Sequence, residues 1–195
     1  MIRQFDREIF RFFNSLAGVS DFGDAVIRFC AAYLLYVMIA LALLFFTITF
    51  LPWFRACRQK NIRATLFIIY SAFIARVAVA EPIRWLWQST RPFEVLVGVR
   101  QLVAHPNGAS FPSGHASLAF GIAAGVAYYY PKTSIVFFVA ALLVGVGRVV
   151  AGVHWPSDIV GGAIAGLMGA FLARRVMSAY TPPPPFFHAT DESNG

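Results

Sequence analysis

The sequence predicts an all-α, polytopic membrane protein: a bundle of about five transmembrane helices with an N-terminal amphipathic helix at the membrane interface. Hydrophobic residues make up 58% of the 195 residues and charged residues only 13%, whereas charged residues average about 25% in soluble proteins. Mean hydropathy is +0.66. Several apolar segments are long enough to cross a hydrocarbon layer about 30 Å thick. Residues 1–180 are therefore expected to form one integral-membrane domain.

The first twenty residues mix charged side chains with phenylalanines at helical spacing and contain no continuous apolar core. This pattern excludes an ordinary cleaved signal peptide and predicts an amphipathic interfacial helix. In the last apolar segment, Gly162 and Gly166 have the GxxxG spacing of closely packed membrane helices. Residues 181–195 are rich in proline and then polar, which predicts an extended, largely disordered tail. The five predicted crossings are about 25–51, 64–87, 113–130, 133–153 and 157–177.

Basic residues predict the orientation of the bundle. Four of them lie between the first two crossings: Arg55, Arg58, Lys60 and Arg63. Short basic loops of this kind stay in the cytoplasm. By alternation, residues 88–112 face outward and the C-terminal tail is cytoplasmic. Because the net charge of +7 is scattered over helix ends and this loop, anionic lipid is the expected counterpart, and nucleic acid is not an expected partner.

Three polar clusters interrupt the apolar sequence. They are RWLWQSTRPF at 84–93, FPSGHASLAF at 111–120 and GRVVAGVHWPSD at 147–158. Polar groups at membrane depth are costly and usually mark a functional site. Since the orientation inferred from the basic loop brings all three clusters to the outer end of the bundle, we interpret them as one site rather than as scattered interfacial residues.

The first two clusters favour anion binding. Arg84 and Arg91 are seven residues apart, which puts both guanidiniums on one helix face if the helix continues that far. Ser113 and Gly114 stand at a predicted helix start, where free backbone N–H groups attract an anion. His115 follows one residue into this helix and is expected to face the same anion.

The third cluster adds groups suited to phosphoryl transfer. Arg148 closes the fourth crossing, His154 follows in a short turn, and Asp158 lies four residues later. A carboxylate at this spacing is able to orient the imidazole and leave its other nitrogen free as a nucleophile or base. Arginines, a helix start, two histidines and one aspartate are the groups needed to bind and transfer a phosphoryl group.

Glu81 is a candidate supporting residue. It could pair with Arg76 or Arg84 as a structural ion pair, or hold a phosphate-binding arginine in place, and we favour the second role. Four other polar residues of the outer loop are each interpreted as part of a solvated loop: Glu94, Arg100, His105 and Asn107.

The segments RWLWQSTRP, PSGH and GRVVAGVHWPSD resemble the signature motifs of the type-2 phosphatidic acid phosphatase superfamily of membrane lipid phosphatases. Arg84 stands where that family usually has lysine, and Gly147 where it usually has serine. The resemblance implies a mechanism without metal or cofactor, in agreement with a sequence that has no clustered carboxylate or His/Cys ligands for a two-metal site. It implies that His154 attacks phosphorus, oriented by Asp158, and that His115 protonates the leaving oxygen. The groups that it implies for holding the phosphoryl oxygens are Arg84, Arg91, Ser113, Gly114 and Arg148.

Within the family, the chain is most similar to the bacterial undecaprenyl-diphosphatases, which recycle the lipid carrier of the cell wall. This similarity implies hydrolysis of undecaprenyl diphosphate to undecaprenyl phosphate through a phosphohistidine, at the outer face of the bacterial inner membrane. One alternative is a phosphatidylglycerophosphate or phosphatidic acid phosphatase, because one phosphate pocket serves monoesters and diphosphates alike. Another is a non-catalytic lipid-binding or transport protein, against which His115, His154 and Asp158 argue. The expected partner is a membrane lipid, and the sequence leaves the oligomeric state open.

Overall fold

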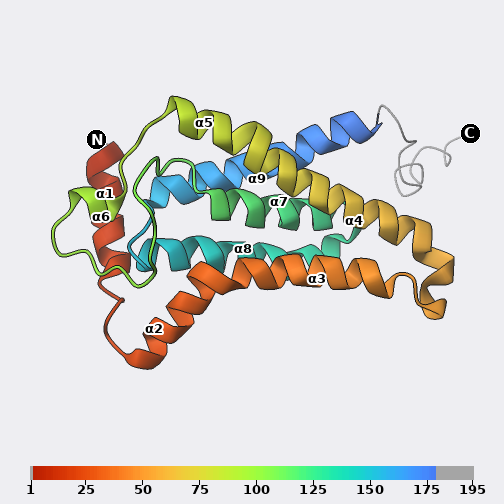
Figure 1. Ribbon diagram of the computed structural model, residues 1–195, viewed down its shortest axis with the longest axis horizontal. Coiled ribbons are helices and arrows are strands. Elements are labelled where there is room, and N and C mark those ends of the chain that lie inside the picture. The colour runs from red at the N-terminus through yellow and green to blue at the C-terminus, as the bar shows by residue number, and fades with distance from the viewer. Residues whose placement is uncertain (1, 179–195) are drawn as a thin grey trace, which may run out of the picture.

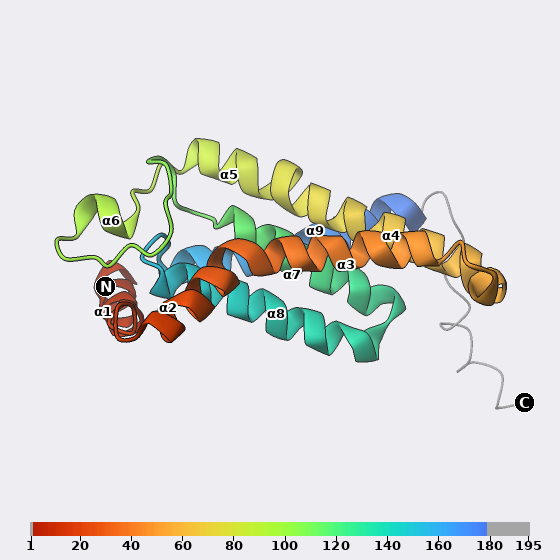
Figure 2. The ribbon, with the colours of Figure 1, turned by 60° about the horizontal axis from the view of Figure 1, so that its bottom comes forward.

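The computed structural model describes residues 2–178, and all regular elements in this range are helical, as predicted (Figure 1). The predicted tail at 181–195 lies outside the described residues. Most helices run along one long axis. The helix α1 (Ile2–Asn14) instead lies across one end of the bundle, where the longest loop also gathers (Figure 2).

The amphipathic helix α1 packs one face on the bundle and leaves the other exposed, as an interfacial helix requires. Phe10 is buried and its ring lies 5.3 Å from the ring of Trp155. The carboxylate of Asp6 accepts hydrogen bonds from the backbone N–H of Ser157 at 2.9 Å and from its hydroxyl at 2.6 Å. Phe12 remains exposed. These contacts attach α1 to the start of the last helix.

The first crossing is a continuous helix over Asp21–Ile48. Ser20 caps its start by accepting a hydrogen bond from the backbone N–H of Gly23 at 3.1 Å. An uncharged apolar sequence then carries the helix through the lipid. The bounds of its parts are α2 (Asp21–Arg28), the π-helix η1 (Phe29–Tyr33) and α3 (Leu34–Ile48).

The second crossing covers Pro52–Leu86. Its last turns contain Pro82, which has no backbone N–H and so removes a regular hydrogen bond to the preceding turn. A wide π-helical segment lies directly before it. The parts are the 3₁₀-helix η2 (Pro52–Cys57), α4 (Arg58–Phe73), the π-helix η3 (Ile74–Ala80) and α5 (Glu81–Leu86).

Proline also determines where later helices begin. It occupies the first position of α6 (Pro92–Val95), α8 (Pro131–Val150) and α9 (Pro156–Ser178). At a helix start the missing N–H costs nothing, because no partner exists for it there. The remaining helix, α7 (Gly114–Tyr129), starts instead at a serine cap, and its C-cap Tyr130 directly precedes the proline that opens α8.

The short helix α7 lies at the centre and packs against α4, α8 and α9. By length and hydropathy, four helices in the described range could span a membrane: Asp21–Ile48, Pro52–Leu86, Pro131–Val150 and Pro156–Met177. The remaining predicted crossing, 113–130, is α7, whose 16 residues extend only about 24 Å at about 1.5 Å per residue. The helix α7 is shorter than the hydrocarbon layer is thick, because its polar start is covered by the loops at one end of the bundle.

Small residues bring these helices close together. A Cβ atom on Gly166 of α9 would lie 2.8 Å from the backbone nitrogen of Gly121 in α7. One on Gly162 would lie 2.8 Å from the carbonyl oxygen of Ser113. The packing role predicted for the GxxxG spacing is therefore confirmed for α7 and α9.

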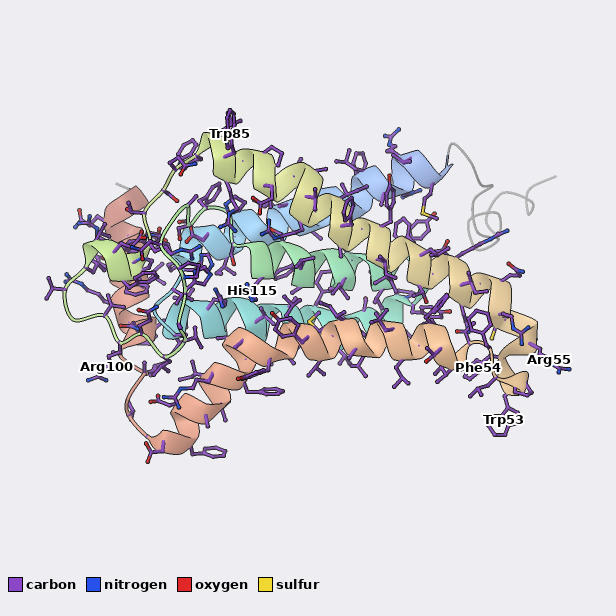
Figure 3. All side chains as sticks on the ribbon, in the orientation of Figure 1. Trp53, Phe54, Arg55, Trp85, Arg100 and His115 are labelled. Carbon is purple, nitrogen blue, oxygen red and sulfur yellow. The ribbon has the colours of Figure 1, made fainter. Side chains whose placement is uncertain are left out.

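The two ends of the long axis differ in composition. Figure 3 shows Trp53, Phe54 and Arg55 at one end and Trp85 and Arg100 at the other. Trp53 and Trp85 are both largely exposed, as tryptophans are in the two interfacial belts of membrane proteins. The loop between α5 and α7, the turn between α8 and α9, and α1 all gather at the Trp85 end (Figure 1).

Candidate active site

His154 and Asp158 form a buried pair at the start of α9. His154 lies in the turn before the helix and Asp158 in its first turn, and each is 1% exposed. Nδ1 of His154 lies 3.1 Å from Oδ2 of Asp158. The same oxygen accepts hydrogen bonds from the backbone N–H of Trp155 at 2.8 Å and from the hydroxyl of Ser110. A proton on Nδ1 of His154 would point at the carboxylate, which leaves a lone pair on Nε2.

Ser110 is a site residue that the sequence analysis missed. Its side chain is fully buried, and Oγ lies 3.3 Å from Nδ1 of His154 in addition to its contact with Asp158. It precedes the predicted helix start by a few residues, and nothing in the sequence distinguishes it from other loop serines such as Ser89. Only the folded loop brings it to the carboxylate.

Arg91 lies beside the free nitrogen of His154. Its Nη1 is 3.2 Å from Nε2 of His154 and donates to the carbonyl oxygen of Val153 at 2.9 Å. Its Nη2 donates to the carbonyl oxygen of Ala109 at 3.1 Å. Burial and the neighbouring Arg84 lower the pKa of Arg91, which nevertheless remains a cation at neutral pH.

Arg84 reaches the same carbonyl oxygen as Arg91, with Nη2 at 3.0 Å from the oxygen of Ala109. The two guanidiniums therefore converge, but not through the geometry that the spacing suggested. The helix α5 ends at Leu86, and residues 87–91 are not helical. A residue that precedes a proline avoids the helical conformation, so Pro92 prevents the helix from continuing through Arg91. Folding of the loop, rather than helical periodicity, brings the two arginines together.

The start of α7 forms another wall of the site. Ser113 is the N-cap, and its Oγ accepts from the backbone N–H of Ala116 at 3.4 Å. The hydroxyl of Ser113 therefore caps α7. The backbone N–H of Ser113 donates to the carbonyl oxygen of Asp158 at 2.9 Å. This bond connects the starts of α7 and α9.

Gly114 makes room for two arginine side chains. A Cβ atom at this position would lie 2.8 Å from Nε of Arg76 and 3.2 Å from Nη1 of Arg84. Two guanidiniums therefore approach this glycine. Arg76 forms an ion pair with Glu81, so that carboxylate binds Arg76 rather than Arg84.

His115 and Arg148 complete the set of predicted residues. His115 lies toward the loop end of the bundle (Figure 3), where the charge of Arg148 acts on its imidazole. Arg148, in the last turn of α8, is 3% exposed, and its Nη1 donates to the carbonyl oxygen of Ala31 at 3.3 Å. All eight predicted catalytic and phosphate-binding residues thus come to one end of the bundle.

Three buried guanidinium nitrogens at this end have no hydrogen-bond partner among the described residues: Nε of Arg91, and Nε and Nη2 of Arg148. A buried donor without a partner costs about 1–3 kcal/mol. Such groups are rare in native proteins, and each one requires an explanation. An anion that accepts these three N–H groups would satisfy them.

Burial and nearby cations keep His154 neutral. Desolvation, followed by the charges of Arg148 and Arg91, lowers the pKa of His154 well below 6.5. At neutral pH the imidazole therefore carries a lone pair on Nε2, next to Arg91. This is the protonation state that a nucleophile or base requires.

Three residues interpreted as solvated also have structural contacts. Glu94 accepts from the backbone N–H of Arg91 at 2.7 Å and from that of Gly108 at 3.1 Å, so it organises the loop. The ring centroid of His105 lies 5.9 Å from that of His154, and burial lowers the pKa of His105 to about 4. Arg100 donates to the carbonyl oxygen of Ala17. Asn107 is exposed, as expected.

Among residues 2–178, no three His, Cys, Asp or Glu side chains come together as a candidate metal site. The functional groups of the described site are instead arginines, two histidines, one buried aspartate and backbone N–H groups. This combination suits an anion that undergoes nucleophilic attack.

Comparisons with known proteins agree with this chemistry. The family model of the PAP2 superfamily matches residues 65–182, which include all three polar clusters. The bacitracin transport permease protein BcrC of Bacillus licheniformis is 30% identical over 165 residues, which cover 84% of this chain and 76% of the relative. The undecaprenyl-diphosphatase BcrC of Bacillus subtilis is 26% identical over 179 residues, covering 90% and 86%. The crystal structure of Aquifex aeolicus LpxE superposes with a TM-score of 0.69 at 26% identity, covering 86% of this chain and 93% of that one.

Proposed function

The chain belongs to the PAP2 superfamily and is a multi-pass bacterial membrane phosphatase that acts on lipid-linked phosphates. From this premise we propose that it hydrolyses undecaprenyl diphosphate to undecaprenyl phosphate and phosphate. The family resemblance inferred from the three motifs is thereby confirmed. The relative named undecaprenyl-diphosphatase in Bacillus subtilis aligns with nearly the whole chain, which supports this substrate.

One observation carries the proposed mechanism: a neutral, buried His154 lies beside Arg91 and within reach of the charge of Arg148, and both guanidiniums have N–H groups that lack partners among the described residues. In the first step, Nε2 of His154 attacks the terminal phosphorus. The bond from phosphorus to the bridging oxygen breaks, and His115 gives that oxygen a proton as the lipid monophosphate leaves. Asp158 stabilises the imidazolium of the phosphohistidine through Nδ1.

Water completes the reaction. With His115 now acting as the base, a water molecule attacks the phosphohistidine, phosphate leaves, and His154 recovers its lone pair. In this scheme the charge on the phosphoryl oxygens is stabilised by Arg84, Arg91 and Arg148 and by the backbone N–H groups at the start of α7. The scheme uses no metal ion.

We further propose that residues 1–180 form one phosphatase domain in the inner membrane, with the site facing the periplasm and the C-terminus in the cytoplasm. The orientation rests on the basic residues from Arg55 to Arg63, which lie near the end of the bundle opposite the site (Figure 3). A diphosphate carried on a lipid would then reach the site from the outer leaflet.

A direct assay of phosphate release tests the substrate and the mechanism. The full chain, purified in detergent, is incubated with undecaprenyl diphosphate, phosphatidylglycerophosphate or phosphatidic acid, with and without EDTA. We expect undecaprenyl diphosphate to give the highest kcat/KM and EDTA to leave turnover unchanged. Faster turnover of phosphatidylglycerophosphate would favour the alternative substrate, and loss of turnover in EDTA would refute the metal-independent scheme.

A trapping experiment tests the roles of the histidines. Quenching in alkaline detergent after mixing with ³²P-labelled substrate should retain label on wild type, which later acid treatment removes, and should retain none on His154→Ala. Asp158→Asn should reduce labelling strongly, because the imidazole loses its anionic partner. Label that persists on His154→Ala would assign the nucleophile elsewhere.

The name of the Bacillus licheniformis relative leads to a second candidate function, transport. A transport or lipid-binding protein would bind the labelled lipid but release no phosphate and form no phosphohistidine. The same trapping experiment therefore distinguishes the two functions.

A further inference from the structure

Arg76 is a charged residue in the membrane that none of the three motif segments contains. It lies in η3 of the second crossing, eight residues before Arg84, which corresponds to about two helical turns further from the loop end. A charge within a crossing is costly and usually lines a site or a polar pathway. The ion pair with Glu81 balances the charge of Arg76. It does not explain the position of the Arg76 guanidinium.

The guanidinium of Arg76 lies against the start of α7. A Cβ atom on Gly114 would come within 2.8 Å of Nε and 3.1 Å of Cζ of Arg76, and within 3.2 Å of Nη1 of Arg84. Two arginines from one crossing therefore approach the same glycine. Arg84 also donates to the carbonyl oxygen that binds Arg91. Arg76 thus lies next to the arginines beside His154, on the side toward the middle of the bundle.

The π-helix contributes to this arrangement. The backbone N–H of Glu81 bonds to the carbonyl oxygen of Arg76, five residues earlier. This wider turn rotates the residues before it relative to those after it. Such segments are rare and frequently occur at functional sites. Arg76 and Arg84 can therefore both turn toward α7, although a regular helix would separate two residues at this spacing by about 80°.

Around Arg76 and Arg84, the positive charge exceeds the negative charge. Among the described residues, Glu81 is the one carboxylate that forms an ion pair with Arg76 or Arg84. Both partners of that pair are partly exposed, with side-chain exposures of 29% for Arg76 and 46% for Glu81, so a ligand can reach them. Two adjacent guanidiniums with one carboxylate have an excess positive charge, which a second anionic group beyond the phosphate next to His154 would balance.

We propose that Arg76 binds the second phosphoryl group of a lipid diphosphate, the one that carries the lipid tail, and thereby favours diphosphates over monoesters. This inference rests on the proposed function. The terminal phosphoryl group lies next to Nε2 of His154 and the guanidinium of Arg91, Arg84 lies next to it, and Arg76 meets the phosphate that leaves with the tail. A monoester has no group at that position, so it leaves Arg76 paired with Glu81.

A matched pair of substrates tests the assignment. Farnesyl diphosphate and farnesyl phosphate have the same tail and differ only in the phosphate that Arg76 would bind. We expect Arg76→Gln to lower kcat/KM for the diphosphate by about 10- to 100-fold, the loss expected for a charge-assisted hydrogen bond. The monophosphate should lose less than about threefold. Arg76→Lys should recover part of the diphosphate activity, because it keeps the charge.

Arg63→Gln is the control, since Arg63 is an exposed arginine of the same crossing near the opposite end. Arg63→Gln should change kcat/KM for neither farnesyl diphosphate nor farnesyl phosphate. Equal losses on both substrates in Arg76→Gln, or no loss on either, would overturn the inference. Labelling of His154 by farnesyl phosphate in the Arg76→Gln protein shows that the variant is folded and separates a lost contact from a lost fold. Wild-type protein inactive on both substrates would overturn the proposed function itself, and this inference with it.

Discussion

The buried carboxylate of Asp158 depends on residues from separate parts of the chain. It accepts hydrogen bonds from the imidazole of His154, the backbone N–H of Trp155 and the hydroxyl of Ser110. Two of these donors are its near neighbours in sequence, but Ser110 comes from the long outer loop. The orientation of His154, the proposed nucleophile, therefore depends on that loop being folded, and we propose Ser110 as a positioning residue.

His105 makes stability depend on pH in a predictable direction. Burial, followed by nearby arginines, lowers the pKa of His105 from 6.5 to about 4, while in the unfolded chain it keeps its ordinary value. Between these values the unfolded chain binds more protons than the folded one, so stability falls as pH decreases from 6.5 toward 4. We expect the Tm in detergent to fall over this window for wild type, and to fall less for His105→Asn.

Comparison with wild type isolates the contribution of His105, because all other titrating groups, including His154, are present in both proteins. Above about pH 7 the histidine is neutral in both states, and any difference in Tm should be constant there. Two curves that remain parallel down to pH 4 would contradict the burial of this imidazole. The measurement is a series of thermal unfolding scans in one detergent.

At the scale of helices, glycines determine how closely α9 approaches its neighbours. A Cβ atom on Gly166 would lie 2.6 Å from Cβ of Phe120 and 2.8 Å from the backbone nitrogen of Gly121. Backbone atoms cannot move aside as the end of a flexible side chain can. Gly166→Ala should therefore force the helices apart and destabilise the bundle by about 1–3 kcal/mol, the usual cost of overpacking.

The measurement is the Tm in detergent, compared with Ile164→Ala as the control. Ile164 lies on the same helix but is 53% exposed on the outer face of the bundle, so truncating it leaves no cavity. We expect a drop of several degrees for Gly166→Ala and a clearly smaller one for the control. Equal Tm values for Gly166→Ala and wild type would mean that α7 and α9 are not held this closely.

The helices also show what the sequence could and could not predict. All five apolar segments are helical, because long uninterrupted apolar runs have few alternatives in a membrane. The helix geometry suggested for Arg84 and Arg91 was wrong. Their spacing suggested that both lie on one helix face, but α5 ends at Leu86. The two guanidiniums still meet, through a loop whose path depends on distant contacts.

Across the whole molecule, motif residues were predictable and their supporting residues were not. His115, His154 and Asp158 stood out because polar groups are rare in so apolar a chain. Ser110 and Asp6 did not, because their roles arise only from contacts with α9, 48 and 151 residues away in sequence. A serine in a loop and an aspartate in a charged helix have many possible uses, and sequence alone does not separate them.

The orientation of the whole molecule is predicted by the unequal distribution of charge between its ends. The basic residues near Arg55 should remain in the cytoplasm, and the site end should therefore face outward. Two exposed positions at opposite ends report this directly. Val97, in the loop near the site, is fully exposed, and Ala56 is exposed within η2. Neither takes part in the described site.

The test uses a cysteine-free background, in which Cys30 and Cys57 are replaced by alanine and serine. A membrane-impermeant maleimide added to intact spheroplasts should label Val97→Cys and leave Ala56→Cys unlabelled. After permeabilisation both should react, which shows that Ala56→Cys is accessible once the reagent can reach it. The reverse pattern would put the site in the cytoplasm, where a lipid diphosphate of the outer leaflet could not reach His154, and would require a substrate of the inner leaflet instead.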